Sequence, residues 1–158
     1  MQKQMRGCRS LKTKIYLDTT IISALFDKRT PERMFQTQQF WKQINEYDVY
    51  ISDLVIDEIK GASQPLQDLM MEKVSEFSIL PITADVEHLA DMYLKSEIFP
   101  DKYSDDALHT AVTSANNIGI LLSWNFTHLV KIRTRRMVAL TNAIHNYIPV
   151  EIISPPEL

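Results

Sequence analysis

Short apolar runs alternate along this chain with segments in which apolar residues recur at helical spacing. The runs are rich in β-branched and aromatic residues and are bounded by polar positions, which is the pattern of short strands. Strands are therefore predicted over residues 15–17, 49–51, 77–80, 120–122 and 150–153. Because strands that alternate with helices build parallel sheets covered on both faces, we expect a three-layer α/β/α fold around a mostly parallel sheet of about five strands.

Helices are indicated by capping residues and by apolar stripes. The clearest helix begins near Ser104 and is expected to end at Gly119, and Thr83 is the expected N-cap of another. Residues 32–47 predict a longer amphipathic helix, whose aromatic side chains we assign to the core, with contact to a partner as the alternative. Two further helices are predicted over residues 53–60 and 66–74.

The chain of 158 residues, 45% of them apolar, is long enough to bury a core without disulfides or a structural metal. Its one cysteine, Cys8, provides neither a disulfide framework nor a cysteine-based zinc site. Residues 1–13 contain basic residues and no acid, so we expect a flexible basic leader before a single domain over residues 14–158. No apolar stretch suits a signal peptide or a membrane span, and a cytoplasmic protein without membrane association is expected.

The formal net charge of −3 argues against broad electrostatic binding to nucleic acid, which needs several Lys or Arg side chains to neutralise phosphates. A localised basic surface is still compatible with this charge. The candidate run comprises Lys131, Arg133, Arg135 and Arg136. We interpret it as a surface that guides the substrate, with an ordinary solvated helix face as the alternative.

Acidic residues occur near the ends of predicted strands, and an open parallel sheet binds ligands beyond the carboxyl ends of its strands. Asp18 follows the first strand, and Glu58 lies about one helical turn after the second. Asp105 and Asp106 open the helix that leads to the fourth strand, and Asn125 follows that strand. If the strands are adjacent, these side chains converge on one cleft.

Carboxylates gathered in one cleft repel one another and raise their own pKa values unless a divalent cation neutralises them. Oxygen ligands of this kind suit Mg²⁺ or Mn²⁺. Such an ion lowers the pKa of a bound water and stabilises the charge that develops during displacement at a phosphodiester. The acidic positions therefore favour phosphodiester hydrolysis.

Each of these residues also has a purely structural interpretation. Asp18 could be the N-cap of the following helix, and Glu58 could lie on a solvated helix surface. The Asp105-Asp106 pair could simply favour the positive end of a helix. His109 and His128 are interpreted as structural, because no other ligand stands at close metal-binding spacing from either.

Four local motifs, in this order, carry a resemblance to a known family. They are Tyr16-Leu17-Asp18-Thr19-Thr20, residues 51–59, Asp106-Ala107-Leu108-His109-Thr110-Ala111 and Leu121-Leu122-Ser123-Trp124-Asn125-Phe126. Over residues 14–158 the chain resembles the PIN-domain nucleases and, among them, the VapC-like toxins of prokaryotic toxin–antitoxin pairs. The resemblance implies an endoribonuclease that uses Mg²⁺ or Mn²⁺ to cleave RNA, is often a homodimer, and is held inactive by a small antitoxin.

The same resemblance implies which residues form the site. The family's three acids fall on Asp18, Glu58 and Asp106, which would hold the metal and carry catalysis. The supporting residues are Thr20, Asp105, Ser123 and Asn125.

One position departs from the family's pattern. Many members place a fourth acid just after the fourth strand, where this chain has Asn125, and His128 stands where another subset has aspartate. An amide brings no negative charge, so a second metal would be held more weakly. One-metal catalysis is therefore favoured.

Two other classes of function remain open. Without the fourth acid, the chain also suits a catalytically degenerate PIN fold that binds RNA or protein. An aspartate at the end of the first strand is also the nucleophile of phosphatases of the haloacid-dehalogenase type. Those enzymes need a second aspartate two residues later, where this chain has Thr20.

Overall fold

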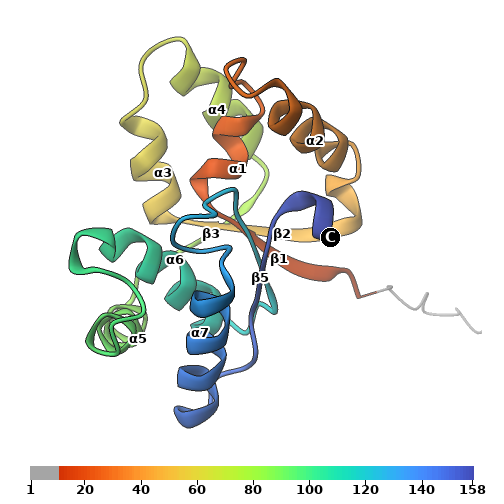
Figure 1. Ribbon diagram of the computed structural model, residues 1–158. Coiled ribbons are helices and arrows are strands. Elements are labelled where there is room, and N and C mark those ends of the chain that lie inside the picture. Colours follow the sequence, from red (N-terminus) through yellow and green to blue (C-terminus); the bar gives the residue numbers. More distant parts are fainter. Residues whose placement is uncertain (1–10) are drawn as a thin grey trace, which may run out of the picture.

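The computed structural model describes residues 11–158, which contain five strands in one parallel sheet of order β3-β2-β1-β4-β5 (Figure 1). The strands are β1 (Thr13–Leu17), β2 (Tyr47–Ser52), β3 (Ser78–Leu80), β4 (Ile120–Leu122) and β5 (Glu151–Ile153). Each strand lies at a predicted position, with its ends shifted by no more than about two residues. The predicted α/β fold with a central parallel sheet is confirmed.

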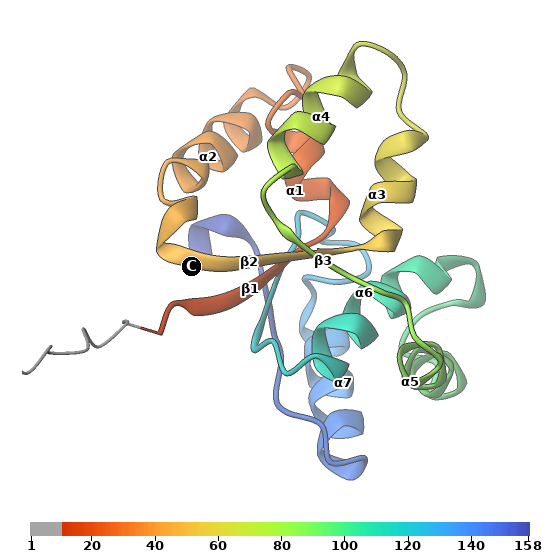
Figure 2. The same cartoon turned by 180° about the vertical axis from the view of Figure 1, so that it is seen from behind.

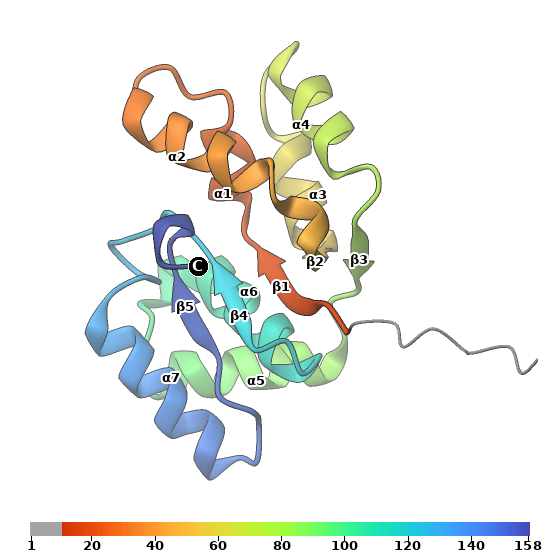
Figure 3. The same ribbon diagram turned by 90° about the vertical axis from the view of Figure 1, so that its right-hand side faces the viewer.

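Helices cover both faces of this sheet, so the molecule has three layers (Figures 1 and 2). The helices on one face are α1 (Thr19–Ala24), α2 (Pro31–Trp41), α3 (Asp53–Lys60) and α4 (Leu66–Val74), and those on the other are α5 (Ala84–Lys95), α6 (Ser104–Ala115) and α7 (Ile132–Ile144) (Figure 3). Three short 3₁₀ helices complete the described residues: η1 (Ile44–Glu46), η2 (Asp101–Tyr103) and η3 (Pro155–Glu157).

The strand order explains why the helices divide into these two groups. From β1 the chain proceeds outward to β2 and β3, and it then crosses to the other side of β1 to form β4 and β5. Because connections between parallel strands are right-handed, reversing the direction of travel moves the helices to the opposite face. The connections therefore diverge between β1 and β4, and ligand sites of open α/β sheets form at such a point.

Strand β1 lies in the middle of the core. Its residues Ile15, Tyr16 and Leu17 are all fully buried, as expected for a strand whose two faces are both covered by helices. On the α5–α7 side, most of the stripe predicted for α6 is buried as well, including Ala107 and Ala111, while Leu108 and Ala115 are half-buried. The apolar pattern thus places β1 at the centre, and the residue that follows it leaves the sheet at its carboxyl edge.

Two predictions about helices were wrong in detail. The helix predicted over residues 32–47 ends at Trp41, and Phe35 on its outer side is 59% exposed and does not belong to the core. The helix from Ser104 ends at Ala115 and not at Gly119, because Asn117, with a φ of 54°, takes the left-handed conformation that follows the last turn.

The predicted cap of α5 is confirmed, since the Thr83 hydroxyl accepts a hydrogen bond of 3.3 Å from the Val86 N–H. The basic leader predicted over residues 1–13 falls largely outside the described residues, so this division of the chain stays a prediction. Within residues 11–158, no helix is long and apolar enough to cross a membrane.

Candidate active site

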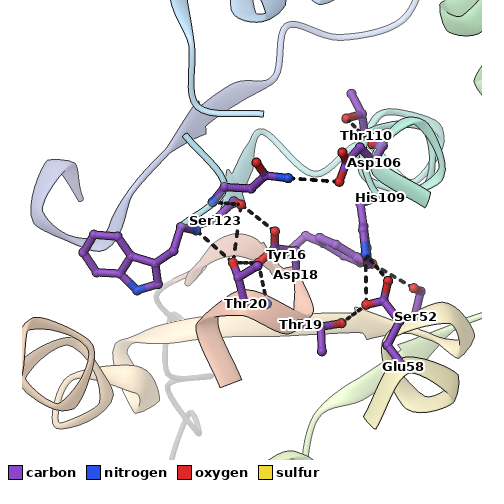
Figure 4. A network of polar contacts seen from close by, with 12 residues as sticks. Tyr16, Asp18, Thr19, Thr20, Ser52, Glu58, Asp106, His109, Thr110 and Ser123 are labelled. Carbon is purple, nitrogen blue, oxygen red and sulfur yellow. Dashed lines mark hydrogen bonds and ion pairs between the residues drawn. The ribbon is translucent and has the colours of Figure 1, made fainter. Parts of the chain in front are cut away.

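Asp18 lies directly after β1, at the point where the connections of the sheet diverge, and its side chain is 2% exposed. It caps α1, because its Oδ1 accepts a hydrogen bond of 3.1 Å from the Thr20 N–H. The hydroxyl of Thr20 donates to the same oxygen, and the hydroxyl of Ser123 donates to Oδ2 (Figure 4). The structural interpretation as a cap is therefore correct, but it describes only part of what surrounds this carboxylate.

The two hydroxyls are themselves oriented by the loop that follows β4. Thr20 Oγ1 accepts from the Trp124 N–H at 2.9 Å, and Ser123 Oγ accepts from the Asn125 N–H at 2.9 Å. Since each hydroxyl has a single proton and accepts a backbone hydrogen bond, that proton is left to donate to Asp18. The backbone thus holds a buried carboxylate with fixed donors on both oxygens.

Asp106 enters the site from the first turn of α6. Its Oδ1 accepts a hydrogen bond of 3.2 Å from the Asn125 side-chain amide, whose Oδ1 in turn accepts from the His128 N–H at 3.0 Å. Burial raises the pKa of Asp106 to about 6, with His109 opposing this shift and the charge of Asp18 adding to it. Asn125 therefore connects the acid of α6 to the loop after β4.

Glu58 on α3 forms an ion pair with His109, at 3.3 Å between Oε2 and Nε2, and also accepts from the Thr19 hydroxyl. Burial is the largest single influence and works against the charged form of Glu58, but the hydrogen bond and charge of His109 and the hydrogen bond of Thr19 together lower the pKa of this acid. For His109, burial is the largest single influence and works toward the neutral form, but the hydrogen bond to Glu58 and the charges of the three acids together raise its pKa. Glu58 and His109 thus each favour the charged form of the other.

His109 is buried and is held on its other side by a second polar chain. Its Nδ1 lies 2.8 Å from the Tyr16 hydroxyl, which lies 2.7 Å from the Ser52 hydroxyl (Figure 4). His109 is therefore not only the structural residue predicted from the sequence, because it is also the partner of Glu58. A signal was present, because His109 lies three residues after Asp106, a spacing that puts both on one face of α6.

The three acids act on one another electrostatically. Burial is the main cause of the raised pKa of Asp18, and the charge of Glu58 contributes in the same direction. Among residues 11–158, no three His, Cys, Asp or Glu side chains lie close enough together to hold one ion. Glu58 is paired with His109, so the elements converge as predicted but the three acidic side chains do not form one cluster.

The donor chemistry of this edge nevertheless fits a hard divalent cation. Carboxylates whose pKa values are raised by burial and by one another lose that penalty when a cation binds between them. Oxygen donors are the ligands that Mg²⁺ and Mn²⁺ prefer.

Within the described part of the chain, neither Asp105 nor the predicted basic run forms a hydrogen bond or ion pair with Asp18, Glu58 or Asp106. Asp105 is exposed on α6 and, among residues 11–158, forms no side-chain hydrogen bond or ion pair. Lys131 lies near His128, where burial first and the charge of Lys131 second lower the pKa of the imidazole. Arg135 forms an ion pair of 3.2 Å with Glu157, which offsets its charge. Two other basic residues are exposed on α7: Arg133 and Arg136.

No family model and no curated protein sequence matches this chain. Two solved structures are similar in fold. The structure of VapBC2 from Rickettsia felis, bound to a DNA fragment from its promoter, has a TM-score of 0.56 and 13% identity, over 90% of this chain and 98% of that one. VapC20 from Mycobacterium tuberculosis, a toxin that cleaves the sarcin–ricin loop, has a TM-score of 0.54 and 16% identity, over 86% of this chain and 98% of that one. The chain therefore has a VapC-like PIN fold.

Proposed function

We propose that this protein is a metal-dependent endoribonuclease that hydrolyses phosphodiester bonds of RNA. The observation that carries the proposal is the placement of Asp18. It is a buried carboxylate at the divergence point of the sheet, with hydroxyl donors fixed on both oxygens and two further acids, Asp106 and Glu58, at the same edge. A residue needed only as a helix cap has no requirement for such an environment.

Asp18, Asp106 and Glu58 would hold Mg²⁺ or Mn²⁺. The ion supplies two things when bound: a lowered pKa for water and neutralisation of charge on the phosphodiester. The protein's own contribution is orientation. Ser123 and Thr20 keep Asp18 in one rotamer, and the Asn125 amide does the same for Asp106. Because Asn125 is neutral, the proposal is for one tightly held ion.

We further propose that the protein acts in the cytoplasm as the toxin of a toxin–antitoxin pair. The support is the fold shared with VapBC2, together with the motifs that resemble VapC-like toxins. On this proposal a small antitoxin protein is the partner, and the toxin itself is a homodimer. Light scattering of the purified chain, alone and with a co-expressed neighbouring protein, measures both assemblies.

A second candidate function is supported by a specific observation. Glu58 is paired with His109 instead of standing with the other acids, and Asn125 replaces a fourth acid. A degenerate PIN fold that binds RNA or protein without cleaving it would show these features.

The deciding experiment is cleavage of RNA by the purified protein with Mg²⁺, Mn²⁺ or EDTA. Because VapC20 cleaves the sarcin–ricin loop, a structured RNA loop should be included beside a mixed RNA pool. The wild type is compared with Asp18→Asn and Asp106→Asn. The matched control is Asp85→Asn, an exposed aspartate in the first turn of α5.

Cleavage that requires the metal and is lost in both site variants, but not in the control, supports the nuclease. Equal background in all samples would refute it and favour the degenerate module.

A further inference from the structure

The loop after β4 carries an aromatic face beside the acids. Trp124 is almost fully buried, and its indole N–H donates a hydrogen bond of 2.8 Å to the Thr37 hydroxyl on α2. Phe126 packs against it, with ring centroids 6.0 Å apart, but remains 47% exposed. An exposed aromatic ring fixed on a buried one is a rigid stacking surface, since little side-chain freedom is lost when a planar ligand binds.

A cation lies on the same aromatic face. The guanidinium of Arg33 on α2 is 5.2 Å from the Trp124 ring centroid and 5.9 Å from that of Phe126. Among residues 11–158, none of the ion pairs involves Arg33. Cation–π contact positions a guanidinium without neutralising it, so Arg33 keeps its charge for an anionic partner.

A recess of about 460 Å³ opens beside this face. It is lined by Trp124 and by residues at the start of α2, which include the acid Glu32 as well as Arg33, whereas Phe126 lies outside the lining. Its position relative to the acids is fixed by the loop. The Trp124 N–H donates to Thr20, which donates to Asp18. Trp124, one wall of the recess, is therefore linked through Thr20 to the candidate active site.

The loop itself is held in one conformation around Asn125. The Asn125 carbonyl accepts from the N–H groups of Leu129 and Val130, at 3.0 and 2.8 Å. Its side chain donates to Asp106, and Phe126 is the next residue along the chain. Phe126 is thus carried by the same fixed loop whose preceding residue contacts Asp106.

We propose that Phe126 and Arg33 form a nucleotide subsite, in which an unpaired RNA base stacks on the Phe126 ring and an adjoining phosphate pairs with Arg33. This inference rests on the proposed ribonuclease function and specifies how the substrate strand is held. A nucleotide combines a planar base with an anion, and the subsite combines an exposed ring with an unpaired cation. An apolar protein segment would leave the charge of Arg33 without a partner.

The proposed subsite would also explain how a protein with a negative net charge binds RNA. A net charge of −3 and three acids at the site argue against broad electrostatic attraction to RNA. Stacking of a base on Phe126 does not depend on the net charge of the protein. The guanidinium of Arg33 would attract only the phosphate next to that base.

The test is binding of a short, fluorescein-labelled single-stranded RNA, measured by fluorescence anisotropy over a range of salt concentrations. Asp18→Asn is the parent protein, so that the RNA is not consumed. Phe126→Leu and Arg33→Gln are made in this parent. The control is Phe35→Leu, which removes a 59% exposed aromatic ring from the same helix as Arg33. Circular dichroism and thermal unfolding verify that each variant is folded.

Phe126→Leu should weaken binding about tenfold and leave the salt dependence unchanged, because stacking involves no counterion release. Arg33→Gln should weaken binding and reduce the slope of log K against log salt by about 0.7, the value for one phosphate of a single strand. Phe35→Leu should bind as the parent does.

A second set of RNAs, each with one abasic position, identifies the stacked base. One abasic position should weaken binding to the parent about tenfold and have no additional effect on Phe126→Leu.

Affinities of Phe126→Leu and Arg33→Gln equal to that of the control would overturn the subsite and leave a protein segment as the occupant of the recess. A parent protein that binds no RNA would overturn it as well. Cleavage by the wild type with Mg²⁺ or Mn²⁺, measured separately, then decides whether the ribonuclease proposal itself stands.

Discussion

Replacing Asp106 with asparagine should make the metal-free protein more stable at neutral pH, although it removes a residue of the candidate site. The pKa of Asp106 is raised from 3.8 to about 6, mainly by burial. The folded state therefore binds a proton more tightly than the unfolded state does. The stability of the metal-free wild type must therefore fall as the pH rises from below 3.8 to above about 6.

The magnitude follows from the size of this shift. About two pKa units at 1.36 kcal/mol each would give roughly 3 kcal/mol for a fully shielded group. Asp106 is partly exposed, so solvent screening reduces this to about 1–2 kcal/mol. The amide introduced by Asp106→Asn would keep the contact, because its oxygen can accept from Asn125 as the carboxylate does.

Urea denaturation in EDTA, repeated across this pH range, measures the effect. Asp106→Asn should gain about 1–2 kcal/mol over the wild type at neutral pH, and this difference should vanish below the ordinary aspartate pKa. Adding Mn²⁺ should reverse the order, because only the wild type binds the ion well. Asp85→Asn is the control and should remain within about 0.5 kcal/mol of the wild type. A variant that is less stable than the wild type at neutral pH without metal would refute this reasoning.

Two further substitutions test the neighbours of the acids. Asn125→Asp adds the fourth carboxylate and should tighten Mn²⁺ binding, measured by calorimetry, while lowering stability in EDTA; unchanged Mn²⁺ affinity would contradict the assignment of this position. His109→Gln should cost about 1.5–3 kcal/mol in urea denaturation, because it removes the charged partner of Glu58. A loss of stability below about 0.5 kcal/mol, as expected for an exposed substitution, would show that the Glu58–His109 pair contributes little to stability.

The local sequence determined the elements and the positions of the acids. The β-rich runs and the helical stripes are properties of neighbouring residues, so the strands and helices α3 and α4 lie where they were predicted. The longer helix was overestimated because its apolar pattern continues past Trp41, whereas the chain turns there into η1 and β2. Periodicity does not reveal that Phe35 faces solvent, since exposure depends on what the rest of the chain places against it.

Strand order was decided by the tertiary structure alone. Only the packing of β4 beside β1 brings Ser123 to Asp18 and Asn125 to Asp106, across separations of 105 and 19 residues. The pairing of Glu58 with His109, and of His109 with Tyr16, likewise joins α3, α6 and β1. The sequence identified the acids from their positions: Asp18 follows β1, Asp106 lies in the first turn of α6, and Glu58 lies in the helix that follows β2. It did not give their partners, because hydrogen bonds between distant segments depend on three-dimensional packing and leave no periodic signal along the chain.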